Sequence, residues 1–304
     1  MDKRFSRTAT LYTIMFLGML VFAVVAFFYG LNLGTNRVET KYAHLNETKV
    51  DKTNYEYQQQ ELASFYLTVY SPYREFQLDW SEALHNISNL KVSNVSSLYK
   101  ELEGQASKKA IEAASYNLQN AGQLGEAQQN YIRSLNQFEK VAATLQKKSS
   151  SITYEEIIEL LKSNESYLTA VSQALKGQAI YFDTMNLWAI SIDPNIPKDF
   201  DENVSQKIST WSKYPLVIKN KIIANYLVEQ NAFVEFLPHD LTSAIDQFIT
   251  SGQAEAMNLT TIDGIITLLL NTAAVRPGDY NLNKNKLYSQ EFLPQISFFY
   301  PNVE

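Results

Sequence analysis

An uncharged, apolar stretch near the start of the chain constrains its fold and location more than any other feature. Thr8 to Asn36 contains no Asp, Glu, Lys or Arg, and residues 11–33 form the apolar centre of this stretch. A helix of about 23 residues rises roughly 34 Å, which matches a hydrocarbon core of about 30 Å. We therefore predict that residues 11–33 are a transmembrane anchor that contacts the lipid bilayer.

Basic residues set the expected orientation of this anchor. Lys3, Arg4 and Arg7 precede it, and Lys and Arg beside a first helix normally stay in the cytoplasm. The pattern predicts a single pass through the cell membrane, with a cytoplasmic tail at residues 1–10 and an extracytoplasmic body. So short a tail cannot bury a core, so any inward signal needs a partner.

A cleavable signal peptide is the competing interpretation, with Val24 and Ala26 in front of the cut. Such a cut would leave Phe27 and its aromatic neighbours at an apolar new terminus. The apolar run is also longer than the roughly 7 to 15 residues usual for a signal. We therefore favour an uncleaved anchor.

The part of the chain after the anchor is acidic. The whole chain has 26 Lys and Arg against 32 Asp and Glu; three of these basic residues and one acidic residue precede the anchor, which leaves a formal charge of −8. Nucleic acid is bound mainly through clusters of Lys and Arg, and the sequence has no basic stripe. We expect no nucleic-acid partner.

Cysteine is absent, so the exported part must be stabilised by packing alone. This favours a bacterial cell envelope. A eukaryotic secretory origin stays open, because Asn-x-Ser/Thr triplets begin at Asn46, Asn86, Asn94, Asn164, Asn203 and Asn258. Several such triplets arise by chance in a chain rich in Asn, Ser and Thr, so we favour unmodified residues at these positions.

Apolar residues recur at helical spacing after a polar stalk at residues 34–54. The first stripe has steps of three and four residues: Leu62, Phe65, Val69, Tyr73, Phe76, Trp80, Leu84 and Ile87. An aromatic stripe at this spacing is normally core. Pro72 interrupts the stripe, but Ser71 followed by Pro72 also suits a helix start. We expect a kink or a restart there, for which a local packing cause is favoured over a hinge.

A second helical period runs from Val95 to Lys148 and is interrupted by Gly122 and Gly125. Two glycines would cost roughly 2 kcal/mol relative to alanine in a continuous helix, whereas they suit a tight turn. We favour the turn, which makes two helices of residues 94–148 instead of one.

A third helix is predicted to start at Thr153, which forms a capping-box pattern with Glu156. Ile152 and Ile157 are placed to form a hydrophobic staple around this start. The apolar period continues to residue 192, and the prolines that follow end the helix and mark a domain boundary.

These patterns predict an all-α protein. Residues 55–192 form an antiparallel bundle of four helices if the glycine turn exists, and three long helices if it does not. Residues 198–304 form a smaller helical domain, with helix starts near Pro215, Asp240 and Thr260. Its tail, residues 276–304, is expected to be irregular chain anchored by Phe292, Phe298, Phe299 and Tyr300.

Motifs that carry chemistry are missing. The sequence has no thiol, no G-x-S-x-G, no H-E-x-x-H, no phosphate-binding glycine loop and no EF-hand spacing. We therefore assign no catalytic residue, no metal ligand and no cofactor. His44, His85 and His239 lack metal-ligand spacing and are interpreted as surface or capping residues.

Two groups of carboxylates have structural interpretations. Glu155, Glu156 and Glu159 lie at a helix start, where the helix dipole stabilises negative charge. Asp199, Asp201 and Glu202 follow the domain boundary and offer oxygen ligands for calcium, but a solvated linker is the favoured interpretation.

Three aromatic residues near the domain boundary are the best candidates for a binding surface. Trp188, Trp211 and Tyr214 flank the segment where the two predicted domains meet, and clefts between domains are common ligand sites. Ordinary packing of the interface is the favoured alternative.

The sequence favours a non-catalytic interaction or scaffold module of the cell envelope with an envelope protein as its partner; association of several copies stays open. The first alternative is a ligand-binding sensor domain that works through a membrane partner. The second is an envelope hydrolase with a carboxylate site. An enclosed apolar pocket would favour the sensor, and paired carboxylates in a cleft would favour the hydrolase. A continuous exposed apolar patch would favour the scaffold.

Overall fold

The computed structural model describes residues 57–89, 91, 94–118, 121–148 and 153–300. The predicted cytoplasmic tail, transmembrane anchor and stalk lie outside these residues, and so does Ile152 of the predicted staple. The described residues all belong to one compact unit that begins at Lys52. Among these described residues, each helix is too short or too polar to pass through a bilayer.

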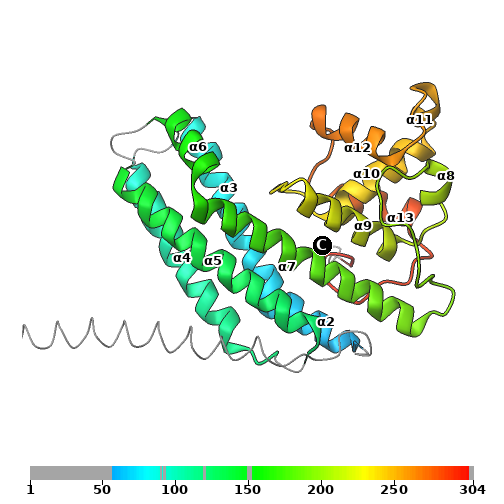
Figure 1. The fold of residues 1–304 in the computed structure, drawn as a ribbon, viewed down its shortest axis with the longest axis horizontal. Helices are drawn as coiled ribbons and strands as arrows, with labels where there is room; N and C mark the ends of the chain where they lie inside the picture. The colour runs from blue at the N-terminus through cyan, green and yellow to red at the C-terminus, as the bar shows by residue number, and fades with distance from the viewer. Residues whose placement is uncertain (1–56, 90, 92–93, 119–120, 149–152, 301–304) are drawn as a thin grey trace, which may run out of the picture. The chain divides into compact units, whose positions relative to one another are not determined.

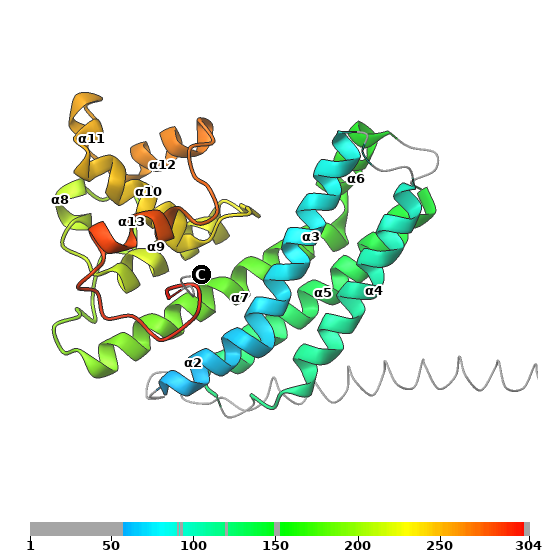
Figure 2. The ribbon, with the colours of Figure 1, turned by 180° about the vertical axis from the view of Figure 1, so that it is seen from behind.

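The described residues are helical and contain no β-strand, which confirms the predicted all-α class. The first part of the unit consists of α2 (Gln59–Phe65), η2 (Tyr66–Tyr70), α3 (Ser71–Ser88), α4 (Val95–Ser115), α5 (Gln123–Lys148), α6 (Tyr154–Ser163) and α7 (Glu165–Ile192). Figures 1 and 2 show α3, α4, α5 and α7 side by side as a bundle, with neighbours in opposite directions. The first predicted stripe is buried along this bundle, except for Leu84, which is half-buried.

Pro72 causes a local change in helix type, as a restart would. Its nitrogen carries no hydrogen and cannot donate to the carbonyl of Thr68. The chain widens into the five-residue π-helix η2, and the Ser71 N–H donates to the carbonyl of Tyr66. Pro72 then occupies the first turn of α3.

The glycine turn is present. α4 ends at Ser115 and α5 begins at Gln123. Gly122 has a φ of 55°, a left-handed conformation that glycine adopts without a steric penalty. Residues 94–148 therefore form two antiparallel helices, and the alternative of one long helix is wrong.

Side-chain caps define the next two helices. The Thr153 hydroxyl accepts from the Glu156 N–H at 3.3 Å, and Glu156 accepts from the Thr153 N–H at 2.7 Å, which confirms the capping box. The predicted single helix to residue 192 is nevertheless divided at Asn164. Asn164 has extended backbone, and its side chain caps α7 by accepting from the Tyr167 N–H at 2.9 Å. Leu168, which follows this break, is 41% exposed.

Several asparagines of the Asn-x-Ser/Thr triplets have structural roles of this kind. Asn94 caps α4, and Asn203 accepts from the Ser205 N–H at 2.8 Å. Asn258 adopts a positive φ of 55°. The structure therefore explains these asparagines without a glycan; Asn46 lies outside the described residues.

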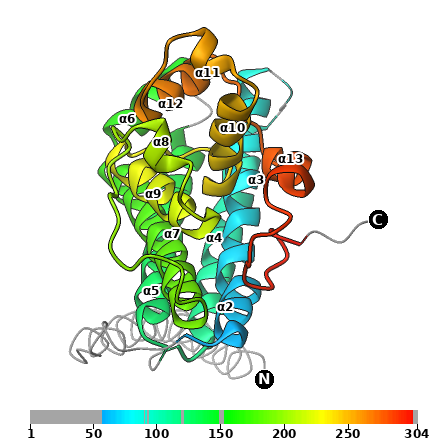
Figure 3. The ribbon, with the colours of Figure 1, turned by 90° about the vertical axis from the view of Figure 1, so that its right-hand side faces the viewer.

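The second part of the unit consists of shorter helices: α8 (Ile208–Trp211), α9 (Leu216–Glu229), α10 (Pro238–Thr250), α11 (Gln253–Ala256), α12 (Ile262–Asn271) and α13 (Asp279–Leu287). α9 packs along α7, and α10 packs against α9, α12 and α13 (Figure 1). Figure 3 shows the chain after α13, drawn in red, beside α2 and α3. The predicted helix starts near Pro215, Asp240 and Thr260 correspond to α9, α10 and α12.

The tail differs from its prediction in one element. Residues 279–287 form the helix α13, which begins after Gly278 at a φ of 91°. The sequence does not indicate α13 because its apolar period is weak: Leu282 is 82% exposed, and only Tyr280 and Asn283 are buried. The rest of the described tail, residues 288–300, is irregular chain as predicted.

One apolar core runs through both parts of the unit. It includes the bundle stripe, the apolar faces of α9, α10 and α12, and Phe299 of the tail. The domain boundary at residues 193–197 stays a prediction.

Candidate functional site

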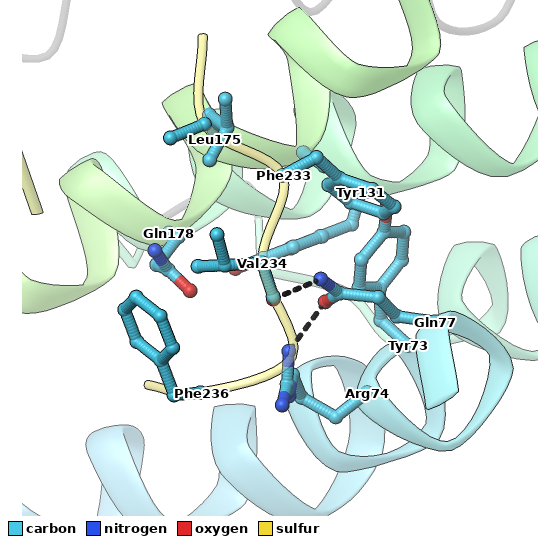
Figure 4. A pocket seen from close by; sticks show the side chains of 11 residues that line it. Tyr73, Arg74, Gln77, Tyr131, Leu175, Gln178, Phe233, Val234 and Phe236 are labelled. Atoms are coloured by element: carbon cyan, nitrogen blue, oxygen red, sulfur yellow. Dashed lines mark hydrogen bonds between the residues drawn. The ribbon is translucent and has the colours of Figure 1, made fainter. Parts of the chain in front are cut away.

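The loop between α9 and α10, residues 230–237, is held against the bundle by two polar side chains of α3 (Figure 4). Arg74 donates from Nη1 to Gln77 Oε1 and from Nη2 to the carbonyl of Glu235, both at 2.6 Å. Gln77 donates from Nε2 to the carbonyl of Val234 at 2.9 Å. Arg74 and Gln77 lie one helical turn apart and therefore face the loop together.

A small cavity lies beside this contact. Its lining comes from Tyr73, Arg74, Gln77, Tyr131, Ala174, Leu175, Gln178, Ala232, Phe233, Val234 and Phe236. Its volume is about 10 Å³, the space of one water molecule. The buried Tyr131 hydroxyl has no hydrogen-bond partner among the described residues, so a water is a chemically suitable occupant. A drug-sized ligand requires at least about 300 Å³.

A much wider groove is open to solvent on the other side of α7. We call it the polar groove; it is lined by Glu126, Asn130, Arg133, Gln173, Lys176, Ala179, Ile180, Glu202, Asn225, Val228 and Glu229. Its volume is about 530 Å³. α5, α7 and α9 all contribute, so it combines residues from both parts of the unit. Its small apolar members, Ala179, Ile180 and Val228, are surrounded by amides and by charges of both signs.

An ion-pair network fixes one wall of the polar groove. Lys221 Nζ lies 3.0 Å from Asp183 Oδ1 of α7 and 2.8 Å from Glu202 Oε1. Asn225 donates to Glu202 Oε2 at 2.9 Å. Burial alone would lower the pKa of Lys221, but the hydrogen bond that Lys221 donates to Glu202 and the negative charge of Asp183 together raise it. Glu202 therefore has defined partners and is not a freely solvated linker residue.

A second polar cluster is buried among α8, α9, α10 and the tail. Asp246 Oδ1 accepts from Trp211 Nε1 at 2.7 Å, and both carboxylate oxygens accept from Lys219 Nζ, at 3.0 and 2.9 Å. The Tyr288 hydroxyl donates a hydrogen bond to Asp246 Oδ2 at 2.7 Å. The side chains of Lys219 and Asp246 are each 9% exposed. Asp246 is thus surrounded by donors and connects four segments of the second part.

Asp240 acts as a helix cap for two helices. Its Oδ2 accepts from the Leu237 N–H at 2.9 Å, and its Oδ1 accepts from the N–H groups of Gly278 and Tyr280, both at 3.1 Å. The helix predicted to start near Asp240 begins slightly earlier: Leu237 is the N-cap, and Asp240 is the third residue of α10. Burial raises the pKa of its carboxyl, and the three N–H groups offset part of that rise.

The three predicted binding residues lie in separate environments. Trp188 is buried beneath Phe292, with the two rings stacked at 5.5 Å and 14°. Trp211 is buried with its N–H on Asp246. Tyr214 packs edge-on against Phe200, and its hydroxyl accepts from the Asp201 N–H at 3.2 Å. They do not line the cavity or the polar groove, and their binding role stays a prediction.

The three histidines differ in their structural environments. His44 lies outside the described residues, and His85 is exposed on α3 beside Asn89. His239 is only 3% exposed, so its interpretation as a surface or capping residue is wrong. No group of three or more His, Asp or Glu in the described part of the chain is arranged to hold a metal ion. Asp199, Asp201 and Glu202, the calcium alternative, are therefore not arranged as a ligand set.

Sequence reasoning missed Arg74, Lys219 and Asp246. A signal existed for Asp246 and Lys219, because each is a charged residue inside an otherwise apolar helical run. Their partners, however, are far apart in sequence, and local periodicity cannot pair them.

No protein family, curated protein or solved structure matches this chain.

Proposed function

We propose that the chain is a single-pass, membrane-anchored helical module that binds an envelope protein through the polar groove and catalyses no reaction. The apolar residues 11–33 and the basic residues before them support an anchor with an extracytoplasmic body. The observation that carries the binding proposal is the polar groove itself.

The composition of the polar groove suits a protein partner. Protein interfaces combine an apolar centre with a polar rim that remains accessible to water. Here Ala179, Ile180 and Val228 supply the centre, and Arg133 and Lys176 are exposed cations of the rim. The groove is formed by long packed helices, which present a surface that needs little rearrangement on binding.

Chemical cross-linking in intact membranes tests this proposal, with the captured protein identified by mass spectrometry. We expect the double charge reversal Arg133→Glu with Lys176→Glu to reduce capture of the partner at least tenfold, because both cations lie at the groove. The matched control is Lys213→Glu, an exposed cation outside the groove. Equal capture of the partner by both variants would contradict binding through the polar groove.

A ligand-binding sensor is the second candidate, and the size of the polar groove favours it specifically. A volume of about 530 Å³ falls within the roughly 300 to 1,000 Å³ of small-molecule sites. If no protein is captured but a polar small molecule raises the thermal midpoint of the body, this candidate replaces the first. The same charge reversal should then abolish the thermal shift.

A further inference from the structure

The last described residues form a segment that is held mainly by side chains. We call residues 293–300 the C-terminal strap. Leu293, Ile296 and Phe299 are buried, yet the backbone–backbone hydrogen bonds described for the strap all lie within it, for example from Phe299 N–H to the carbonyl of Ile296 at 2.9 Å. From outside, Lys284 donates to the carbonyl of Phe299 and lies 4.0 Å from the Tyr300 ring centre. Displacing the strap therefore breaks few hydrogen bonds.

The strap covers His239 of α10. The imidazole stacks on Phe298 at 4.8 Å and 16°, and Phe299 lies 5.4 Å away. Phe182 of α7 and Tyr280 of α13 complete the enclosure, at 6.2 and 5.1 Å. His239 Nδ1 has no hydrogen-bond partner among the described residues. The ring thus lies between aromatic surfaces, and its Nδ1 atom has no group among the described residues placed to accept a hydrogen bond from it.

The charged groups around His239 do not stabilise its protonated, imidazolium form. The Arg74 guanidinium of α3 adds to the effect of burial, and together they lower the pKa of His239 to about 3. Asp240 directs its oxygens to the N–H groups of Leu237, Gly278 and Tyr280. Lys284 approaches the strap from α13, and the Tyr70 ring lies 6.0 Å from the Phe298 ring. Water can stabilise an imidazolium here only if part of the enclosure moves away.

We propose that the C-terminal strap is an acid-sensitive latch: protonation of His239 by solvent releases residues 293–300 and uncovers an aromatic slot formed by Tyr66, Tyr70 and Phe182. The strap is the part of the enclosure that moves, because Phe182, Tyr280 and His239 itself belong to packed helices.

The size of the effect follows from proton linkage. An exposed histidine has a pKa of about 6.5, so the open state gains a proton below that pH while the closed state does not. The ratio of open to closed strap should rise about tenfold between pH 7.5 and 5.5. Burial raises the pKa values of Asp240 and Glu291, so these carboxyls take up protons in the closed state and oppose release in more acidic solution.

Hydrogen exchange of the full chain at pH 7.5 and 5.5, read by mass spectrometry, tests the latch. Protection factors correct for the chemical exchange rate at each pH. We expect those of the Phe299 and Tyr300 amides to fall about tenfold in acid, while amides of α5 remain more strongly protected at both pH values. His239→Phe should abolish the pH dependence, and His239→Met serves the same purpose if the larger ring prevents folding. His85→Phe, at an exposed histidine, should retain it.

Two results would overturn the proposal. One is equal protection of the strap amides at both pH values. The other is strap and α5 amides with the same protection that fall together, because exchange would then require global unfolding instead of strap release.

Discussion

The bundle and the shorter helices after it are stabilised by different chemistry. In the bundle, aromatic rings pack in series: Trp80 lies 4.8 Å from Phe138, and Tyr73 lies 4.6 Å from Tyr131. In the second part, the buried carboxylates of Asp240 and Asp246 organise the helices around them. Apolar stripes can be recognised in a sequence, whereas a buried charge is understood only with its distant partner.

The largest effect should come from breaking the buried ion pair of the second part. Asp246→Ala leaves the Lys219 ammonium buried without its counter-ion, and we expect the free energy of unfolding to fall by about 3 to 5 kcal/mol. Adding Lys219→Met should restore part of this loss. Urea denaturation measures both. The control Lys162→Ala, at the exposed pair with Glu159, should change stability by less than about 0.5 kcal/mol. A loss below about 1 kcal/mol for Asp246→Ala would contradict the role given to this cluster.

The packing of the bundle can be tested with two helical glycines. A Cβ on Gly177 would lie 3.0 Å from the Tyr131 ring, while a Cβ on Gly104 would meet nothing within 4 Å. The rings of Phe65, Tyr70 and Tyr73 lie around Tyr131 and oppose its displacement, so we expect Gly177→Ala to cost about 1 to 2 kcal/mol net. Gly104→Ala should instead stabilise by up to about 1 kcal/mol. Thermal unfolding of the two variants gives the comparison, and a shift in the same direction for both would show that the ring yields.

The contact between the two parts can be weakened at Arg74. Arg74→Met removes the hydrogen bonds to Gln77 and to the carbonyl of Glu235 but keeps the aliphatic stem. We expect a loss of about 1 kcal/mol, discounted because Arg74 is partly exposed. Arg133→Met, at an exposed position in the polar groove, is the control and should stay within about 0.5 kcal/mol. Equal stability of both variants in urea would mean that the loop is held by packing alone.

The smallest effect concerns a helix start. Thr153→Ala removes the acceptor for the Glu156 N–H and should cost about 0.5 to 1 kcal/mol, whereas Thr153→Ser keeps the hydroxyl and should cost less. Circular dichroism during thermal unfolding separates the two. An alanine variant as stable as the serine variant would show that the cap is not needed.

The sequence predicted those parts of the fold that depend on local signals. The aromatic stripe around Trp80, the turn at Gly122 and the cap at Thr153 all follow from spacing within a few residues. The break at Asn164 was missed because the apolar period continues across it. The helix α13 was missed because its sequence has almost no apolar period.

The polar contacts were largely unpredictable. Arg74 reaches a carbonyl 161 positions away, and Lys219 and Asp246 are separated by 27. His239 resembled a surface residue because the aromatic rings that bury it come from segments distant in sequence. The polar groove also requires three helices to meet, so no spacing along the chain could predict it.

Limited trypsin digestion of sealed right-side-out spheroplasts tests the central claim of an anchored, extracytoplasmic body most directly. The predicted stalk contains Arg37, Lys41 and Lys49, so cleavage should release the body into the medium while a cytoplasmic marker stays intact. Alkaline washing of uncut membranes should leave the full chain in the pellet. A chain that is protected until the spheroplasts are lysed, or that alkali extracts whole, would contradict the account.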